Sequence, residues 1–313
     1  MTSPFRYHMR RFADVTTEQY FSPDHLSNYV ADLANQIDAV RIDPAVGDGA
    51  IFHKLKQPRV GFEIDPSLPG ITKDFLTVTN QDLPPGPKCV VMNPPFSLPG
   101  RKNGVIHFVN HCVTCLEDKS HIITVAPQSM RKWSNIMKLH PTIHLTHETV
   151  FKTPVKFKRG AKTVSIRVVV QTYQIIHDTH RRQPTLLNKH PMFRISATNP
   201  ENASFFMKRM GSLKRLGAVA KGYQIKDGRK TTEVGVLPGK YTMAQATGVH
   251  ATDDSVFEKM QSLYSSGVWE RVYADSCAGN NPTMSNAFVY TVFEFGEAYL
   301  DKRTYGITVT FKP

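Results

Sequence analysis

Asn93-Pro94-Pro95-Phe96 is the segment of this sequence whose residue types and order point most directly to chemistry. It follows the apolar run 88–92, which predicts a buried strand. Two prolines stiffen the turn after this strand and hold the Asn93 amide and the Pro94 carbonyl in fixed directions. Both oxygens can accept a hydrogen bond from one planar NH₂ group, and the Phe96 ring can stack on the ring that carries it. The segment therefore predicts a site for a planar amine.

Three turns that each carry an acidic residue precede this segment in a set order. The first turn, residues 43–49, contains two glycines, which permit a tight turn and close approach of a ligand to the backbone. Glu63 follows about 20 residues later, where a carboxylate is well placed to accept the hydroxyls of a ribose. Asp74 and Phe75 could then hydrogen-bond and stack on an adenine. The order predicts an adenosine-bearing cofactor, and the lack of a full Gly-x-Gly-x-x-Gly motif argues against a dinucleotide.

The elements that must position these residues alternate between helix and strand, with Ser22 as the expected cap of the first helix. The predicted strands cover residues 40–44, 59–65, 88–92, 120–126 and 163–176, the predicted helices cover 23–39, 51–56, 104–117 and 254–264, and further strand-like runs cover 286–295 and 305–311. This alternation is typical of a doubly wound α/β domain with ligands at the carboxyl ends of its strands. A polar, basic stretch at 178–191 marks a boundary. The sequence predicts a Rossmann-like α/β domain over residues 1–177 and an α+β second domain over residues 178–313.

The basic charge of the chain lies in one segment. The sequence has 39 Lys and Arg against 26 Asp and Glu, a formal net charge of +13. Residues 152–230 contain 18 of the basic residues and three acids, a net +15, which leaves −2 for the remainder. Ordinary surfaces mix both signs of charge, so this segment predicts binding to the phosphates of a nucleic acid. The candidate nucleic-acid-binding residues are Arg101, Lys102, Lys158, Arg159, Lys208, Arg209, Lys214 and Arg215.

Composition excludes several other classes of protein. No apolar run approaches the roughly 18 residues of a membrane span, so no membrane association is expected. Four cysteines exclude a disulfide scaffold and favour an intracellular location, cytoplasmic or in the nucleoid or nucleus, and the basic start of the chain leaves a mitochondrial location open. No metal is expected, because one helix carries the only candidate ligands, which are predicted to be buried in the core. These residues are His107, His111, Cys112 and Cys115.

In these motifs the chain resembles the adenine-N6 methyltransferases that use S-adenosylmethionine, with the γ order of motifs. The resemblance covers about residues 18–177. Asn93-Pro94-Pro95-Phe96 is similar to the catalytic motif of the family, and Tyr20-Phe21-Ser22-Pro23 is similar to the segment that packs on the methionine part of the cofactor. The resemblance implies S-adenosylmethionine as the cofactor and a set of residues that bind it. They are Tyr20, Phe21, Pro23, Asp43, Pro44, Gly47, Gly49, Glu63, Asp74 and Phe75.

The resemblance also implies the reaction, which is methyl transfer to the N6 amino group of an adenine in nucleic acid. A base in a duplex must be flipped out of the stack first. A second ring, from Phe151 or Phe157, would face Phe96 across that base. DNA is the favoured substrate. The alternatives are the same reaction on RNA, a binding or assembly protein that keeps the fold without turnover, and methylation of a glutamine side chain in a protein.

Overall fold

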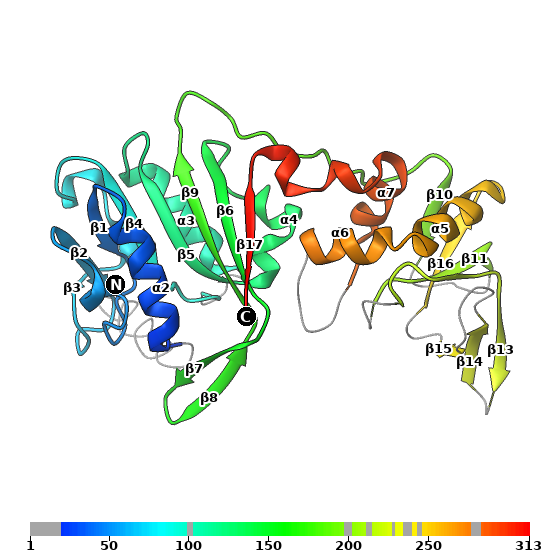
Figure 1. Cartoon of the computed structure of the whole chain (residues 1–313), viewed down its shortest axis with the longest axis horizontal. Helices are drawn as coiled ribbons and strands as arrows, with labels where there is room; N and C mark the ends of the chain where they lie inside the picture. The colour runs from blue at the N-terminus through cyan, green and yellow to red at the C-terminus, as the bar shows by residue number, and fades with distance from the viewer. Residues whose placement is uncertain are drawn as a thin grey trace, which may run out of the picture. The chain divides into compact units, whose positions relative to one another are not determined.

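The structure is a computed structural model that describes residues 20–98, 103–196, 202–210, 215–226, 229–233, 240–242, 246–276 and 283–313 (Figure 1). The chain divides into two compact units. Unit 1 comprises residues 1–182 and 306–313, and unit 2 comprises residues 183–305. The expected second domain, residues 178–313, therefore differs from unit 2 at its C-terminal end. Residues 306–313 belong to unit 1, because a strand formed by them pairs with its sheet.

Unit 1 is built on an eight-stranded sheet in the order β17-β6-β9-β5-β4-β1-β2-β3. Its strands are β1 (Val40–Asp43), β2 (Arg59–Glu63), β3 (Ile71–Thr72), β4 (Lys88–Met92), β5 (His121–Pro127), β6 (Ile143–Phe151), β9 (Val168–Ile175) and β17 (Thr308–Lys312). β9 runs antiparallel to β5 and β6, and the other neighbouring strands are parallel. The strand order reverses between β1 and β4, and open α/β sheets bind ligands at the carboxyl ends of strands at such a reversal. This sheet confirms the predicted Rossmann-like α/β fold.

Both faces of the central strands are buried. Helix α2 (Asp24–Asn35) packs Leu26, Val30 and Ala34 into one cluster with alternate residues of β4 and β5, namely Cys89, Val91, Ile123 and Val125. The intervening Val90, Met92 and Ile122 are also buried. Strands with two buried faces read as continuous apolar runs, which is why residues 88–92 were recognisable in the sequence. The other helical segments of unit 1 are η1 (Phe52–Lys54), η2 (Phe75–Thr77), η3 (Asn80–Asp82), α3 (Gly104–Cys115), η4 (Gln128–Arg131) and α4 (Trp133–Ile136).

A hairpin of two strands follows β6 and extends beyond the sheet in Figure 1. It consists of β7 (Val155–Arg159) and β8 (Lys162–Ile166), which pair with each other in an antiparallel register. The single strand predicted over residues 163–176 is therefore two strands with Arg167 between them. β-branched residues continue through both, so the sequence pattern did not reveal the break.

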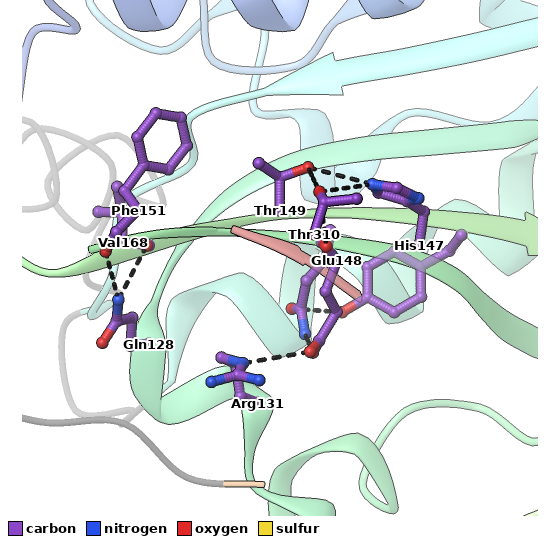
Figure 2. Close-up of polar contacts among 10 residues, drawn as sticks. Gln128, Arg131, His147, Glu148, Thr149, Phe151, Val168 and Thr310 are labelled. Carbon is purple, nitrogen blue, oxygen red and sulfur yellow. Dashed lines mark hydrogen bonds and ion pairs between the residues drawn. The ribbon is translucent and has the colours of Figure 1, made fainter. Parts of the chain in front are cut away.

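A buried polar network lies where β6, β9 and η4 meet (Figure 2). Arg131 Nε donates to Glu148 Oε2 at 3.2 Å, and both side chains are buried. Gln171 Nε2 donates to Glu148 Oε1 at 2.7 Å, and the Tyr173 hydroxyl donates to Gln171 Oε1 at 2.7 Å. A buried charge is tolerated when it is paired and hydrogen-bonded in this way.

Unit 2 contains two antiparallel sheets and three α-helices in the part that the structure describes. The strands are β10 (Phe193–Ser196), β11 (Phe205–Lys208), β12 (Val219–Ala220), β13 (Gly222–Lys226), β14 (Arg229–Glu233), β15 (Lys240–Thr242) and β16 (Ala246–Ala251), and the helical segments are α5 (Ser255–Ser265), α6 (Val268–Ser276), α7 (Asn286–Phe295), η8 (Glu297–Tyr299) and η9 (Lys302–Tyr305). No helix among the described residues is long and apolar enough to cross a membrane.

The strand predicted at residues 286–295 is wrong, since these residues form α7. The aromatic and β-branched composition favours a strand locally. Ser285 instead caps a helix, and its side chain accepts a hydrogen bond from the Phe288 amide. Residues 288–293 are all buried, so tertiary packing decides against the local preference.

Candidate active site

The sequence-predicted motifs meet at the carboxyl ends of β1 and β4. Asp43 is the last residue of β1, and Asn93 directly follows β4. These parallel strands are neighbours in the sheet, so their ends lie at the strand-order reversal. The glycine turn and the Asn-Pro-Pro-Phe loop thus belong to one region of unit 1.

The Asn93 side chain is held by the segment that precedes α2. Its Nδ2 atom donates to the Tyr20 main-chain carbonyl at 2.8 Å and to Ser22 Oγ at 3.0 Å. A carbonyl can only accept, so this contact fixes which end of the amide is nitrogen. Asn93 Oδ1 is buried and has no hydrogen-bond partner among the residues that the structure describes. The amide therefore presents an oriented acceptor that a donor from another molecule can satisfy.

Ser22 is a residue of the candidate site whose contact the sequence reasoning did not anticipate. It was expected to cap α2, but Pro23 occupies the N-cap position and no side chain caps the helix. The Pro23 carbonyl accepts from the amides of Leu26 and Ser27 at 3.0 Å each. The only available signal was the position of Ser22 inside the motif Tyr-Phe-Ser-Pro.

The loop that carries Pro94, Pro95 and Phe96 packs against the start of α3. The Gly104 amide donates to the Phe96 carbonyl at 2.9 Å. A Cβ atom added to Gly104 would lie 2.1 Å from the Pro95 carbonyl oxygen, which is a forbidden contact. Gly104 is thus required for close approach of the helix to the loop. The sequence reasoning did not single it out.

Three aromatic rings cluster beside Asn93. The Tyr20 and Phe96 rings stack with centroids 5.7 Å apart, and the Phe157 ring meets both edge-on at 6.3 and 6.4 Å. Tyr20 and Phe96 are half-buried, whereas Phe157 is 0% exposed and Phe151 is 6% exposed. Phe157 therefore contacts Phe96 but has no free face, so the expected base sandwich by Phe151 or Phe157 does not match their burial.

The glycine turn and Glu63 form one hydrogen-bonded unit. Glu63 accepts from the amides of Gly47 at 2.7 Å, Ile64 at 2.8 Å and Asp65 at 3.1 Å. A carboxylate has about four acceptor positions, so about one is left for a ligand hydroxyl. Gly47 and Gly49 have φ values of +57° and +84°, in the left-handed region that glycine favours. The Phe21 ring lies against this turn, 3.5 Å from where a Gly47 Cβ would be.

Asp43 lies beneath this turn. Its side chain is almost fully buried and accepts from the Ala45 amide at 3.1 Å. The pKa of Asp43 is raised to about 7, chiefly by burial and to a lesser extent by the Glu63 charge, against the lowering effect of the Ala45 hydrogen bond. Pro44, which follows it, is also buried. Asp43 and Pro44 are therefore buried residues at the start of the turn, and Asp43 stabilises it through the hydrogen bond from the Ala45 amide.

The third predicted turn is only partly available to a ligand. Asp74 is half-buried and caps η2 by accepting from the Leu76 amide at 3.0 Å. The Phe75 ring is 2% exposed and packs against Phe62, Phe108 and His111. The expectation that Phe75 stacks on the cofactor adenine is wrong for its ring, because that ring belongs to the core.

The His and Cys residues of α3 are part of the fold. His111 Nε2 lies 2.9 Å from the Val78 carbonyl oxygen, and Cys112 and Cys115 are buried. Burial raises the pKa of Cys115 to about 12. No group of three or more His, Cys, Asp and Glu that could hold a metal occurs within the described ranges.

The eight predicted nucleic-acid-binding residues divide into four groups, the last of which comprises Lys208 and Arg209. Lys158 and Arg159 are exposed on β7, and the Arg159 guanidinium lies 5.5 Å above the Tyr20 ring. Arg215 is exposed in unit 2. Arg101, Lys102 and Lys214 lie outside the described residues.

Lys208 and Arg209 do not match the prediction. Lys208 is 6% exposed, and its burial lowers its pKa. Arg209 donates to Thr247 Oγ1 at 3.1 Å, to the Met284 carbonyl at 3.3 Å and to the Asn286 side chain. Both residues serve the packing of unit 2, which a count of basic residues does not reveal.

Comparisons with known proteins give methyltransferases among the similar structures. No family model matches the chain, and no curated protein matches it. Part of the chain is similar to a protein from Pyrococcus horikoshii provisionally assigned as an RNA methyltransferase, with 16% identity over 52% of this chain and 89% of that one and a TM-score of 0.37. It is also similar to a provisionally assigned class I S-adenosylmethionine-dependent methyltransferase from Listeria monocytogenes, with 14% identity over 50% and 61% of the two chains and a TM-score of 0.39. A third similar structure is the M protein of the type I restriction enzyme EcoKI, with 16% identity over 51% and 45% and a TM-score of 0.37.

Proposed function

We propose that this chain transfers a methyl group from S-adenosylmethionine to the N6 amino group of an adenine in nucleic acid. The observation that carries the proposal is Asn93 Oδ1, a buried acceptor without a partner in the described part of the chain. Leaving a buried acceptor unpaired costs about 1–3 kcal/mol, so the site favours a ligand that donates a hydrogen bond. The exocyclic amine of adenine is a planar donor with two N–H groups.

Each residue of the loop has a distinct task in this reaction. Asn93 Oδ1 accepts one hydrogen of the amine and the Pro94 carbonyl accepts the other, which favours a more tetrahedral and more nucleophilic nitrogen. Phe96 stacks on the base and fixes its plane. S-adenosylmethionine, when bound, supplies an electrophilic methyl group. The residues of the chain contribute mainly by holding the amine in line for direct displacement, in which an N–C bond would form as the S–C bond breaks. The neutral thioether would leave, and the methylated nitrogen would lose one proton to water.

The residues around the glycine turn fit the proposed cofactor. The turn offers backbone without a side chain at Gly47, whereas Gly49 is buried against the His53 ring, and Glu63 retains about one acceptor position for a ribose hydroxyl. Asp74 and the Tyr20–Pro23 segment complete the proposed site. The γ order of motifs, with Tyr20–Pro23 first and a recognition domain last, remains part of the proposal, as does the role of unit 2 in recognising the target.

A nucleic acid is the proposed substrate because of the charge of residues 152–230, a net +15. DNA is favoured over RNA, although both present the same adenine edge. Single-stranded regions need no base flipping and are the simplest substrates to test.

The test is methyl transfer from labelled S-adenosylmethionine to duplex DNA, single-stranded DNA and RNA in parallel. The wild-type chain is expected to label at least one of them at the N6 position of adenine. Asn93→Ala is expected to lower turnover by about a hundredfold or more, the effect of losing one donor or acceptor aligned with reacting atoms. Phe96→Ala is expected to have a similar effect.

Calorimetric titration with the cofactor provides the control. Both variants are expected to bind S-adenosylmethionine with at most a modest loss of affinity, because the glycine turn and Glu63 stay intact and each change removes only a contact with Tyr20 or Ser22. Full activity in Asn93→Ala would remove the loop from the mechanism. Cofactor binding by the wild type without transfer to any nucleic acid would favour a non-catalytic binding protein.

A further inference from the structure

We infer that the β7–β8 hairpin is the surface that binds the phosphate backbone beside the target base. This inference rests on the proposed function, because it names where the nucleic acid lies relative to Asn93. Six basic residues and no acid occur between residues 152 and 167. All six are exposed, and they are Lys152, Lys156, Lys158, Arg159, Lys162 and Arg167.

The hairpin has one buried and one basic face. Val155 and Phe157 point into the core of unit 1 and are 4% and 0% exposed. Lys156 and Lys158 alternate with them and are exposed on the opposite face, as the period of a strand requires. The partners of these lysines across the hairpin are Ser165 and Thr163, which are also exposed.

This combination of side chains suits phosphate groups. Lysines and hydroxyl side chains are among the groups that contact phosphate oxygens in nucleic-acid complexes, where they set the position of the strand. The hairpin itself carries no acidic residue, and the nearby Asp24, whose pKa is lowered mainly by Lys54 and also by Lys158, is one negative charge beside six positive ones. The net positive charge of the basic face therefore attracts a polyanion.

The hairpin is attached to the sheet on the side where the strands have their carboxyl ends, which is also the side of the proposed site. β9 is antiparallel to both β5 and β6, so β5 and β6 run in the same direction, and β4 is parallel to β5. The carboxyl end of β6 therefore lies on the same side of the sheet as the carboxyl end of β4. Gln128 Nε2 donates to the carbonyls of Phe151 at 2.8 Å and Val168 at 3.4 Å, at the two ends of the hairpin segment (Figure 2). The main-chain N–H of Gln128 also donates to the Arg167 carbonyl at 3.0 Å.

A continuous set of contacts joins the basic face to Asn93. The Phe21 amide donates to the Lys158 carbonyl at 3.0 Å, and the Lys158 amide donates to the Phe21 carbonyl at 3.3 Å. The adjacent Tyr20 carbonyl accepts from the Asn93 amide. Lys158 is thus joined through Phe21 and Tyr20 to the amide that would receive the adenine. The phosphates that bind at Lys156 and Lys158 would belong to the nucleic-acid strand that carries the target adenine.

The experiment compares two double charge reversals of equal net charge. The hairpin variant, Lys156→Glu with Lys158→Glu, alters the basic face. The control variant, Lys56→Glu with Lys119→Glu, alters two exposed lysines on the opposite side of the sheet, where the parallel strands have their amino ends. Lys56 precedes β2 and Lys119 precedes β5, so both lie at the amino ends of the parallel strands. Fluorescence anisotropy measures binding of single-stranded and duplex oligonucleotides between 50 and 200 mM salt, and circular dichroism checks that each variant is folded.

The hairpin variant is expected to bind at least about tenfold more weakly, and its log–log salt slope should be shallower by about 1.4 to 1.8 for two lost phosphate contacts. The control variant should keep the wild-type slope. An unchanged slope in the hairpin variant overturns the inference, and so does an equal loss in both variants. If the hairpin variant is poorly folded, the neutral pair Lys156→Gln with Lys158→Gln takes its place. It should also bind oligonucleotides more weakly and with a shallower salt slope than the wild type.

Two further measurements separate this inference from the proposed reaction. Calorimetric titration with S-adenosylmethionine should give the same affinity in the hairpin variant and the wild type. If oligonucleotide binding depends on the hairpin but no methyl transfer occurs, the inferred binding surface is supported and the proposed reaction is refuted. Hairpin-dependent binding to anionic lipid vesicles, with oligonucleotide binding unaffected, would identify a membrane surface and overturn the nucleic-acid inference.

Discussion

At the scale of single residues, the orientation of the Asn93 amide depends on one hydroxyl and one carbonyl. Ser22→Ala removes the hydroxyl at 3.0 Å and leaves the Tyr20 carbonyl. A typical hydrogen bond contributes about 0.5–1.5 kcal/mol, so turnover is expected to fall by up to about tenfold. Single-turnover kinetics measure this, with the Michaelis constant for the cofactor expected to stay constant.

Ser22→Thr is the matched control, because it keeps the hydroxyl and should retain most of the turnover. If Ser22→Ala were as fast as the wild type, the hydroxyl would have no part in positioning Asn93. A rise in the cofactor Michaelis constant alone would assign Ser22 to cofactor binding instead.

Asp43 makes stability depend on pH. Its folded pKa of about 7 lies above the ordinary value of 3.8, because burial disfavours the charged form. Its contribution to stability is therefore fully present below about pH 4 and is lost as the pH rises through 7. The slope is at most about 1.4 kcal/mol per pH unit between the two pKa values.

Denaturant titrations of the wild type and Asp43→Asn between pH 4 and pH 8 test this. The Asn variant cannot ionise at this position, so its free energy of unfolding should fall less steeply over this range. Identical pH profiles for the two proteins would show that Asp43 does not titrate there.

At the scale of elements, the contact between α3 and the Asn-Pro-Pro-Phe loop limits what residue 104 can be. Gly104→Ala would place a Cβ atom 2.1 Å from the Pro95 carbonyl oxygen, so the loop or the helix must shift. Misplacement of reacting groups by about 1 Å can cost a hundredfold in rate. We expect a loss of turnover between about tenfold and a hundredfold.

Gly86→Ala is the control, since a Cβ there meets nothing within 4 Å and the strain at its φ of +96° falls before the amino end of β4, at the opposite end of that strand from the loop. It should leave turnover unchanged. Wild-type turnover in Gly104→Ala, with the same thermal midpoint, would mean that the loop tolerates the displacement.

At the scale of the whole molecule, unit 2 is inserted between two parts of unit 1. The chain leaves unit 1 after Arg182 and returns at Gly306, and β17 then pairs with β6 as the edge strand of the sheet. Removal of residues 306–313 would expose the backbone of β6, whose residues 148–151 are buried. An exposed edge strand is a template for aggregation.

A chain that ends at Tyr305 is expected to unfold at a lower temperature than the full chain. A loss of about 2 kcal/mol corresponds to about 4–8 °C in a unit of this size. Differential scanning fluorimetry measures the midpoint, and light scattering detects aggregation. Phe311→Ser in the full chain keeps the strand and removes its exposed ring, so an equal effect would assign the loss to the ring rather than to strand pairing.

The distribution of charge also changes meaning at this scale. Residues 152–230 are basic as a segment, but they span both units. Lys156 and Lys158 are exposed beside the proposed site, whereas Lys208 is buried in unit 2. The sequence therefore indicated a polyanion as a partner, and burial decided which basic residues are available to it.

The sequence alone determined the order of the strands that end in the candidate site residues. The apolar run 88–92, the turn 43–49 and the alternation of elements follow local rules of periodicity and turn chemistry, which need no knowledge of distant neighbours. These rules located β4, β1 and the loop at Asn93. They failed at α7, where burial on all sides overrode the local preference for a strand.

Only the tertiary structure decided what each side chain of the candidate site contacts. Asn93 receives its orientation from Tyr20 and Ser22, more than 70 residues earlier in the chain. Phe75 has the type and position of a stacking ring, yet it is enclosed by core residues. Hydrogen bonds and burial of this kind depend on packing between distant segments, and a local pattern in the sequence carries no record of it.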